Sequence, residues 1–275
     1  MLFRSIAAFA QSTPSNPLLI IRADFATADP LAPHHETLDR IVADRPVVVH
    51  NTSEHALFVN AKALALAGIG DAPLADAAEE KGVIRDASGH PTGVLLEAAQ
   101  ETVERAVLPL IPEAEKLRLL QAGMRHLNSF GITSIVNATG DLAEIELYGK
   151  LRDAGQLTVR TRTAFGAVAY PHRLSERFLA DLETARTKFH DEWVAANLVK
   201  FFADGSTGLA PPIVYVPNDY RNLVKELDRR GYDLMTHAQR GDSVHLILDA
   251  YEAATSDRKS TRLNSSHIPL SRMPS

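Results

Sequence analysis

The alternation of helical and extended patterns over residues 112–254 constrains the fold more than any other feature of the sequence. Apolar residues recur at helical spacing at its start, and the β-branched run ITSIVNA follows directly. The predicted elements are helix 112–129, strand 132–138, helix 141–153, strand 157–165, helix 174–189, strand 198–204, helix 218–230, strand 233–238 and helix 242–254. Strands separated by helices pair in parallel through right-handed crossovers, so we predict four β-α units.

Such units form either an open doubly wound sheet or part of a (β/α)₈ barrel. No glycine-rich phosphate loop follows any predicted strand, which favours the barrel. The first hundred residues are less regular, with an extended run at 45–51, a helix at 59–67 and a stretch rich in Gly and Pro at 81–93. We therefore predict an α/β fold: a partial (β/α)₈ TIM-type barrel, with an elaborated N-terminal loop region or inserted subdomain over about 38–111.

Composition narrows the chemistry. The chain has no cysteine, so any metal must be held by His, carboxylate or a modified Lys. The net charge of −5 and the lack of a basic stripe argue against nucleic acid as a partner. No membrane span or signal peptide is evident, so we expect a cytoplasmic protein with a small-molecule substrate. The sequence indicates no oligomeric state.

Polar residues end the last two predicted strands, where (β/α)₈ enzymes carry their reacting groups. Lys200 and Asp204 lie on one face of LVKFFAD, and His237 ends DLMTHA. A buried ammonium is costly unless it is paired, deprotonated or modified. Lys200 therefore either lies at a strand edge, pairs with Asp204, or has a chemical role.

The segment HAQRGDSVHLILDAYEAA, which starts at His237, resembles the His-Ala-x-x-Gly-Asp segment of the amidohydrolase superfamily. Further similar segments occur in the expected order: RPVVVHNTSEHALFVNAKALALAGI, GVIRDASGHPTGVLLEAA, FGITSIVNA and VKFFADGS. Together they cover about residues 38–254 and resemble amidohydrolase family 3, the branch of N-substituted formamide deformylase. The resemblance implies a distorted barrel with one or two divalent metals, usually zinc, whose activated hydroxide attacks an amide-type carbonyl.

The resemblance also implies roles for particular residues. His237 corresponds to the strand-five metal ligand, and Lys200 to the strand-four position, where relatives often carry a carbamylated Lys that bridges two metals. Asp204, Ser206 and His55 would line the substrate side. The expected substrate is a small compound with a non-peptide C–N bond, amide or formamide-like.

Some features of the family pattern are missing. The sequence has no His-x-His pair; His34 and His35 are adjacent, so strand alternation would point them to opposite faces. The catalytic residues are therefore expected outside this chain, and the chain itself is expected to be inactive. Two alternatives stay open: a Schiff-base aldolase-type barrel that uses Lys200, and a non-catalytic α/β scaffold.

The two ends differ in character from the rest. Met1 to Ser5 and residues 257–275 resemble translations of short-read sequencing adapters. We therefore expect residues 6–256 to be an internal piece of a hydrolase and both ends to be artefacts of sequencing.

Overall fold

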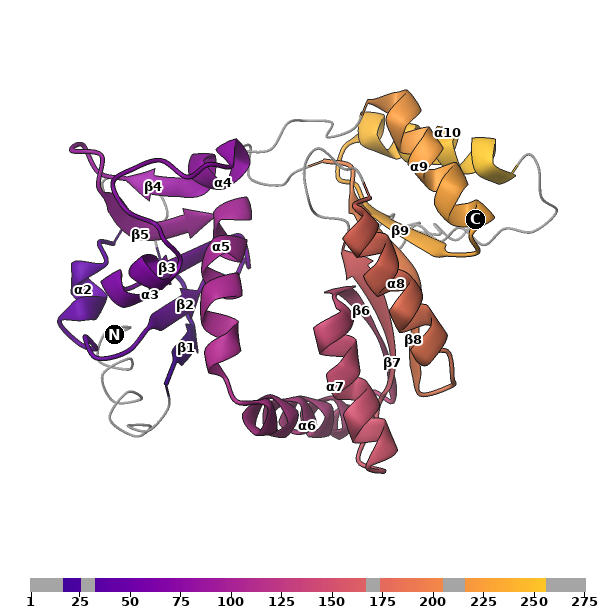
Figure 1. The fold of residues 1–275 in the computed structure, drawn as a ribbon, viewed down its shortest axis with the longest axis horizontal. Helices are drawn as coiled ribbons and strands as arrows, with labels where there is room; N and C mark the ends of the chain where they lie inside the picture. The colour runs from indigo at the N-terminus through magenta and orange to yellow at the C-terminus, as the bar shows by residue number, and fades with distance from the viewer. Residues whose placement is uncertain (1–16, 26–32, 167–173, 205–215, 256–275) are drawn as a thin grey trace, which may run out of the picture. The chain divides into compact units, whose positions relative to one another are not determined.

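A computed structural model describes residues 17–25, 33–166, 174–204 and 216–255 (Figure 1). Ser206 and the two end segments that resemble adapters lie outside these residues. The chain divides between Glu113 and Ala114 into two compact units, each with its own sheet. No helix in the described part of the chain is long and apolar enough to cross a membrane.

Unit 1 is built on a five-stranded mixed sheet in the order β1-β2-β3-β5-β4. Only β1 and β2 are parallel, and the other pairs are antiparallel. The strands are β1 (Leu19–Arg22), β2 (Val47–His50), β3 (Ala56–Val59), β4 (Val83–Arg85) and β5 (Pro91–Leu96). The helices are α2 (Glu36–Asp39), α3 (Ala61–Leu66), α4 (Ala77–Gly82) and α5 (Ala98–Val107), with a 3₁₀ turn at Leu108–Leu110. The stretch rich in Gly and Pro thus contains β4, a turn over 86–90 and the start of β5.

The sheet of unit 1 is covered on both faces. Its strands are continuous apolar runs such as VVVH and ALFV, and successive side chains point to opposite sides. On one side, Val48, Leu57, Val59 and Leu95 of the sheet pack against helix residues that include Ala63 of α3 and Val103 of α5. On the other side, Leu19, Val47, Val49, Phe58 and Val94 of the sheet pack around Leu38 of α2. Both sides of this sheet are therefore core.

Asn60 joins the sheet of unit 1 to α3. Its side chain is fully buried, and its Oδ1 accepts from the backbone N–H groups of Val47 and Ala63, which caps α3. Its Nδ2 donates to the carbonyl oxygens of Val42 and Arg45 at 3.0 and 2.9 Å. All of these hydrogen bonds stay inside the protein, so the buried amide is fully satisfied.

Unit 2 contains a parallel sheet in the order β6-β7-β8-β9, with helices between successive strands. Its elements are α6 (Glu113–Ser129), β6 (Ser134–Gly140), α7 (Leu142–Asp153), β7 (Arg160–Gly166), α8 (Glu176–Lys188), β8 (Val194–Phe202), α9 (Pro217–Arg229), β9 (Asp233–His237) and α10 (Gly241–Thr255). The prediction of an α/β fold with a parallel sheet is confirmed. In the described part of the chain, β6 and β9 do not pair with each other, so these strands form no closed barrel.

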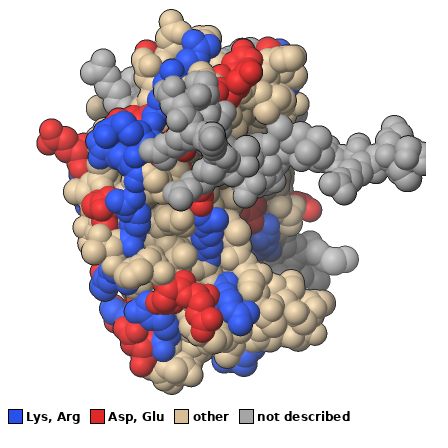
Figure 2. All heavy atoms as spheres, turned by 90° about the vertical axis from the view of Figure 1, so that its right-hand side faces the viewer, with Lys and Arg blue, Asp and Glu red and all other residues tan. Residues whose placement is uncertain are grey.

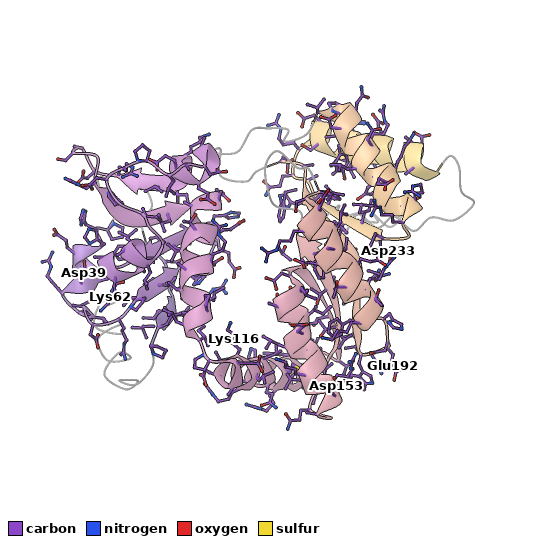
Figure 3. All side chains as sticks on the ribbon, in the orientation of Figure 1. Asp39, Lys62, Lys116, Asp153, Glu192 and Asp233 are labelled. Atoms are coloured by element: carbon purple, nitrogen blue, oxygen red, sulfur yellow. The ribbon has the colours of Figure 1, made fainter. Side chains whose placement is uncertain are left out.

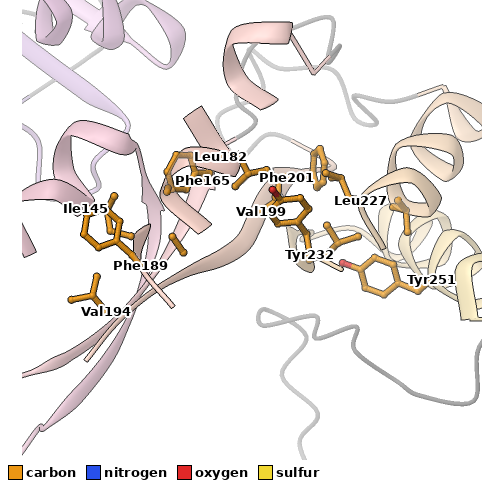
Figure 4. Packing of buried hydrophobic residues seen from close by; sticks show 14 of the residues in the cluster. Ile145, Phe165, Leu182, Phe189, Val194, Val199, Phe201, Leu227, Tyr232 and Tyr251 are labelled. Atoms are coloured by element: carbon orange, nitrogen blue, oxygen red, sulfur yellow. The ribbon is translucent and has the colours of Figure 1, made fainter. Parts of the chain in front are cut away.

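One face of this second sheet carries the main core of the unit. Phe165, Val199, Phe201 and Leu234 pack there with the apolar faces of the helices, and Figure 4 shows Phe201 and Val199 among them. Among the described residues, the buried apolar group on the opposite face is smaller: Ala164, Leu198 and Met235. Val136 in β6 is about half exposed. The two faces are therefore unequal, and the sparsely covered one is available for other roles.

Charge does not single out any part of the surface in Figure 2. Lysine and arginine side chains are interspersed with aspartate and glutamate over the face that the figure displays. Ion pairs within single helices, such as Arg186 with Glu183 and Arg229 with Glu226, account for part of this mixture. The side chains that matter for function must therefore be sought by their burial and position.

Candidate metal centre at the carboxyl ends of β8 and β9

Lys200 and His237 lie on the same face of neighbouring strands. In the parallel register Lys200 is paired with Met235, and Phe202 with His237. Because alternate residues of a strand share a face, Lys200, Phe202 and His237 point away from the helix-covered side where Phe201 and Leu234 are buried. Both predicted ligands therefore lie on the sparsely covered face, near the carboxyl ends of their strands.

Lys200 is buried, with only 2% of its surface exposed. Its Nζ lies 4.8 Å from the centre of the Phe202 ring. The part of the chain that the structure describes offers it no ion pair and no hydrogen bond, and Asp204 does not pair with it. Burial lowers the pKa of Lys200 to about 8. The amine is therefore much closer to its neutral, nucleophilic form than an ordinary lysine.

Asp204 holds the loop that follows β9. Its buried carboxylate accepts hydrogen bonds from the backbone N–H groups of Gln239, at 2.9 Å, and Arg240, at 3.0 Å. The same carboxylate lies 3.7 Å from Nε2 of His237. Asp204 thus fixes the backbone just after His237 and is close to its imidazole. This contact gives Asp204 a positioning role next to the predicted ligand.

His237 is the most accessible of these groups. Its side chain is 22% exposed, and its ring lies 5.7 Å from that of Phe202. An imidazole at the carboxyl end of a strand in a parallel sheet can act as a zinc ligand. The site therefore combines an accessible imidazole with a desolvated amine on one face.

The donor set fits only part of a metal centre. A catalytic zinc site needs three protein ligands, and among the described residues no group of three or more His, Asp or Glu side chains is placed to hold a metal ion. His237 and Lys200 supply two candidate ligands, the latter only when neutral or modified. Both oxygens of Asp204 already accept backbone hydrogen bonds. The described residues thus resemble one side of a site.

His55 lies in unit 1, beyond the end of β2. Its Nδ1 is 3.2 Å from Oε1 of Glu97, the residue between β5 and α5. Sequence reasoning missed Glu97, because a glutamate after a strand has no distinctive pattern. His34 and His35 differ from expectation: their rings lie 4.4 Å apart rather than on opposite faces. The reason is that His35 has helical backbone angles and precedes α2, so strand alternation does not apply.

A second polar group occupies the other end of the sparsely covered face. Arg162 in β7 donates to Oδ1 of Asn197 in β8 at 3.0 Å and pairs with Asp233, which Figure 3 labels at the start of β9. Asn197 also donates to Asp233. This network joins three strands toward their amino ends, away from Lys200 and His237. Each of its residues is a polar residue within or at the start of a predominantly apolar strand, and this pattern in the sequence could have revealed the network.

The sequence was also compared with known protein families and relatives. Residues 2–269 match the family model described as amidohydrolase family. The chain belongs to the amidohydrolase family. It is 27% identical over 241 residues to N-substituted formamide deformylase from Arthrobacter pascens, covering 80% of this chain and 43% of that protein. It is 28% identical over 234 residues to the exoenzymes regulatory protein AepA of Pectobacterium carotovorum, covering 78% and 49%.

Solved structures show a similar fold. A metal-dependent hydrolase from Pyrococcus horikoshii superimposes with a TM-score of 0.64 at 18% identity, over 91% of this chain and 50% of that one. One from Pyrococcus furiosus gives 0.62 at 20% identity, over 92% and 52%. The chain thus spans about half the length of the proteins it matches.

Proposed function

We propose that the protein this chain represents hydrolyses a C–N bond in a small amide or formamide-like compound, with one or two divalent metals, zinc in the first instance. The observation that supports this most directly is the placement of Lys200 and His237 on one face at the carboxyl ends of adjacent strands. Membership of the amidohydrolase family supports the reaction class. The name of the Arthrobacter pascens relative supports an N-substituted formamide as the first compound to test.

The residues have distinct tasks in this proposal. A bound metal would polarise the carbonyl and lower the pKa of a water. His237 and a carbamylated Lys200 would hold that metal, and Asp204 would keep the backbone after His237 in place through its contacts with Gln239 and Arg240. The ring of Phe202 shields the Lys200 amine from water. The family resemblance gives Asp204, Ser206 and His55 as substrate contacts, and each keeps that role in the proposal.

Carbamylation would follow from the chemistry of Lys200. The neutral amine attacks CO₂, a new N–C bond forms, and a proton leaves to solvent, which gives an anionic carbamate. With a pKa of about 8, about a tenth of the amine is neutral at pH 7, far more than for an exposed lysine. NMR with ¹³C-labelled bicarbonate should show a carbamate signal that Lys200→Arg abolishes and that Lys188→Arg, at an exposed lysine, retains. An unchanged signal in Lys200→Arg contradicts the assignment.

Metal binding tests the proposal itself. Equilibrium dialysis against zinc should load the chain weakly, because the described residues provide two ligands rather than three. His237→Ala should remove this zinc, whereas His245→Ala, at an exposed histidine of α10, should retain it. Equal zinc content in both variants would count against His237 as a ligand. For the same reason we expect the chain alone not to hydrolyse an N-alkylformamide.

The lowered pKa of Lys200 favours a second candidate, an aldolase-type reaction through a Schiff base. The amine would attack a carbonyl carbon and lose water to form an imine. Borohydride would reduce that imine and leave the substrate attached to Lys200. Attachment that is independent of metal would favour this candidate over the hydrolase.

A further inference from the structure

The turn between β5 and α5 contains an unusual backbone conformation. Glu97 has φ 47° and ψ −121°, a region that residues with a side chain rarely adopt. In the part of the chain that the structure describes, only Glu54 is a second non-glycine residue with positive φ. Such a conformation persists only where the surrounding structure enforces it, and it is concentrated at functional positions.

Close packing enforces this conformation. A Cβ at Gly82 would lie 2.1 Å from the carbonyl oxygen of Leu96 and 2.8 Å from Cβ of Ala99, so the turn is pressed against the end of α4. The backbone N–H of Glu97 donates to the carbonyl oxygen of His55 at 3.3 Å. A sharp strand-to-helix turn with a strained residue at its apex is the arrangement that displays the reactive side chain in nucleophile elbows. The side chain of Glu97 projects from this turn toward His55.

The carboxylate of Glu97 does not cap α5; it is directed to His55. Its Oε2 forms a hydrogen bond with Nδ1 of His55 at 3.4 Å, whereas Oε1, which lies 3.2 Å from the same nitrogen, is buried and has no hydrogen bond in the described structure. A buried acceptor without a donor is costly and is a feature that a ligand can satisfy. The imidazole beside it is 44% exposed, so the pair is open to solvent on one side.

The surroundings carry several carboxylates, of which Glu101 is paired with Arg105 at 3.6 Å. Glu101 and Glu104 follow on the same face of α5, one and about two turns further along. Burial, and then the nearby carboxylates of Glu101 and Glu54, raise the pKa of Glu104. A cation that also donates hydrogen bonds would therefore be attracted to this end of the helix face.

We propose that Glu97 and His55 form a binding site in unit 1 for the ammonium group of a small organic amine. The ammonium supplies the missing donor to Oε1 of Glu97, and the carboxylates on α5 supply the charge. An amine is also what hydrolysis of an N-substituted amide releases, so the choice of ligand class rests on the proposed function. The site itself rests on the geometry of Glu97 and His55 alone.

The test is a titration of the full chain with n-butylammonium, with 1-butanol as the neutral control of matching shape. Backbone amide NMR signals around Glu97 and His55 should move in a saturable way with the ammonium and stay in place with the alcohol. Glu97→Gln should weaken the binding at least tenfold. Absence of a saturable change, or an equal response to both compounds, would overturn the proposal.

Two glycine substitutions separate a ligand role from backbone strain. Glu97→Gly relieves the positive φ, so its Tm should rise by about 2–4 °C while ammonium binding disappears. Glu54→Gly relieves a similar φ in an exposed turn but also removes a nearby carboxylate, so it should raise the Tm and weaken ammonium binding far less than Glu97→Gly does. If Glu97→Gly binds the ammonium as the unmodified chain does, the proposal fails. Zinc binding that depends on His237 is measured separately, so failure of the metal centre is recognised independently.

Discussion

Both units bury polar side chains, and a comparison of Asn60 in unit 1 with Lys200 in unit 2 shows two opposite environments. Asn60 in unit 1 uses both ends of its amide in hydrogen bonds with four backbone groups. Lys200 in unit 2 is as deeply buried, yet the described residues give it only the face of Phe202. The sheet around Asn60 is core on both sides, whereas Lys200 lies on a sparsely covered face. Satisfied burial indicates a structural role, and unsatisfied burial indicates chemistry.

Core truncations should break or confirm the division into two units. Phe58→Ala in unit 1 and Phe201→Ala in unit 2 should each reduce stability by about 3–5 kcal/mol. The single tryptophan, Trp193, lies in unit 2, so its fluorescence reports on that unit. In urea, Phe201→Ala should shift the unfolding transition seen by Trp193 fluorescence to lower urea concentration. Phe58→Ala should leave that transition in place and shift only the part of the circular dichroism transition that comes from unit 1. Equal shifts of Trp193 fluorescence in both variants would show one cooperative unit.

Removal of the Asn60 amide should destabilise the protein strongly. Asn60→Ala leaves buried backbone groups of β2 and α3 without partners and removes the cap of α3, a loss of about 2–4 kcal/mol. Urea denaturation followed by circular dichroism measures the change. Asn222→Ala, at an exposed asparagine of α9, is the control and should cost far less. If Asn60→Ala lowered the free energy of unfolding by less than the control does, the Asn60 amide would not be structural, and its contrast with Lys200 would be lost.

Removal of the Lys200 amine should have the opposite sign. Because its pKa is lowered from 10.5 to about 8 in the folded protein, the charged amine costs stability below pH 8, and this cost disappears as the pH rises toward 10.5. Lys200→Met should therefore stabilise the protein by about 1–2 kcal/mol at pH 7, with allowance for screening. Denaturation at pH 7 and pH 10 tests this. A gain that does not shrink at pH 10 would mean that it comes from the packing of Met and not from removal of a buried charge, and a loss of stability would mean that the amine is paired.

The smallest effect on stability is expected at the sparsely covered face. Val136 is about half exposed in β6, which is an edge of the sheet, and such edges promote association. Val136→Lys should change stability by no more than about 0.5 kcal/mol but reduce aggregation, measured by light scattering. Unchanged aggregation would indicate that association starts elsewhere.

The sequence predicted the parallel sheet and the placement of Lys200 and His237 because both follow from periodicity, which is a local property. It did not predict β4 and β5, because glycine there serves close approach rather than a loop: a Cβ at Gly93 would lie 2.5 Å from the carbonyl oxygen of Val59. The tasks of Asp204 and Glu97 were also hidden. Each depends on contacts with residues more than thirty positions away, for which a single sequence has no pattern.

The hydrogen bonds from Gln239 and Arg240 to Asp204 have a consequence for ligand affinity. A loop that becomes ordered only on binding loses conformational entropy at that moment, and the affinity falls accordingly. Here the order is established during folding, so a ligand of His237 meets a backbone that is already fixed. Replacement of Asp204 should therefore appear mainly as an unfavourable entropy of binding in calorimetry, with the ligand contacts themselves unchanged.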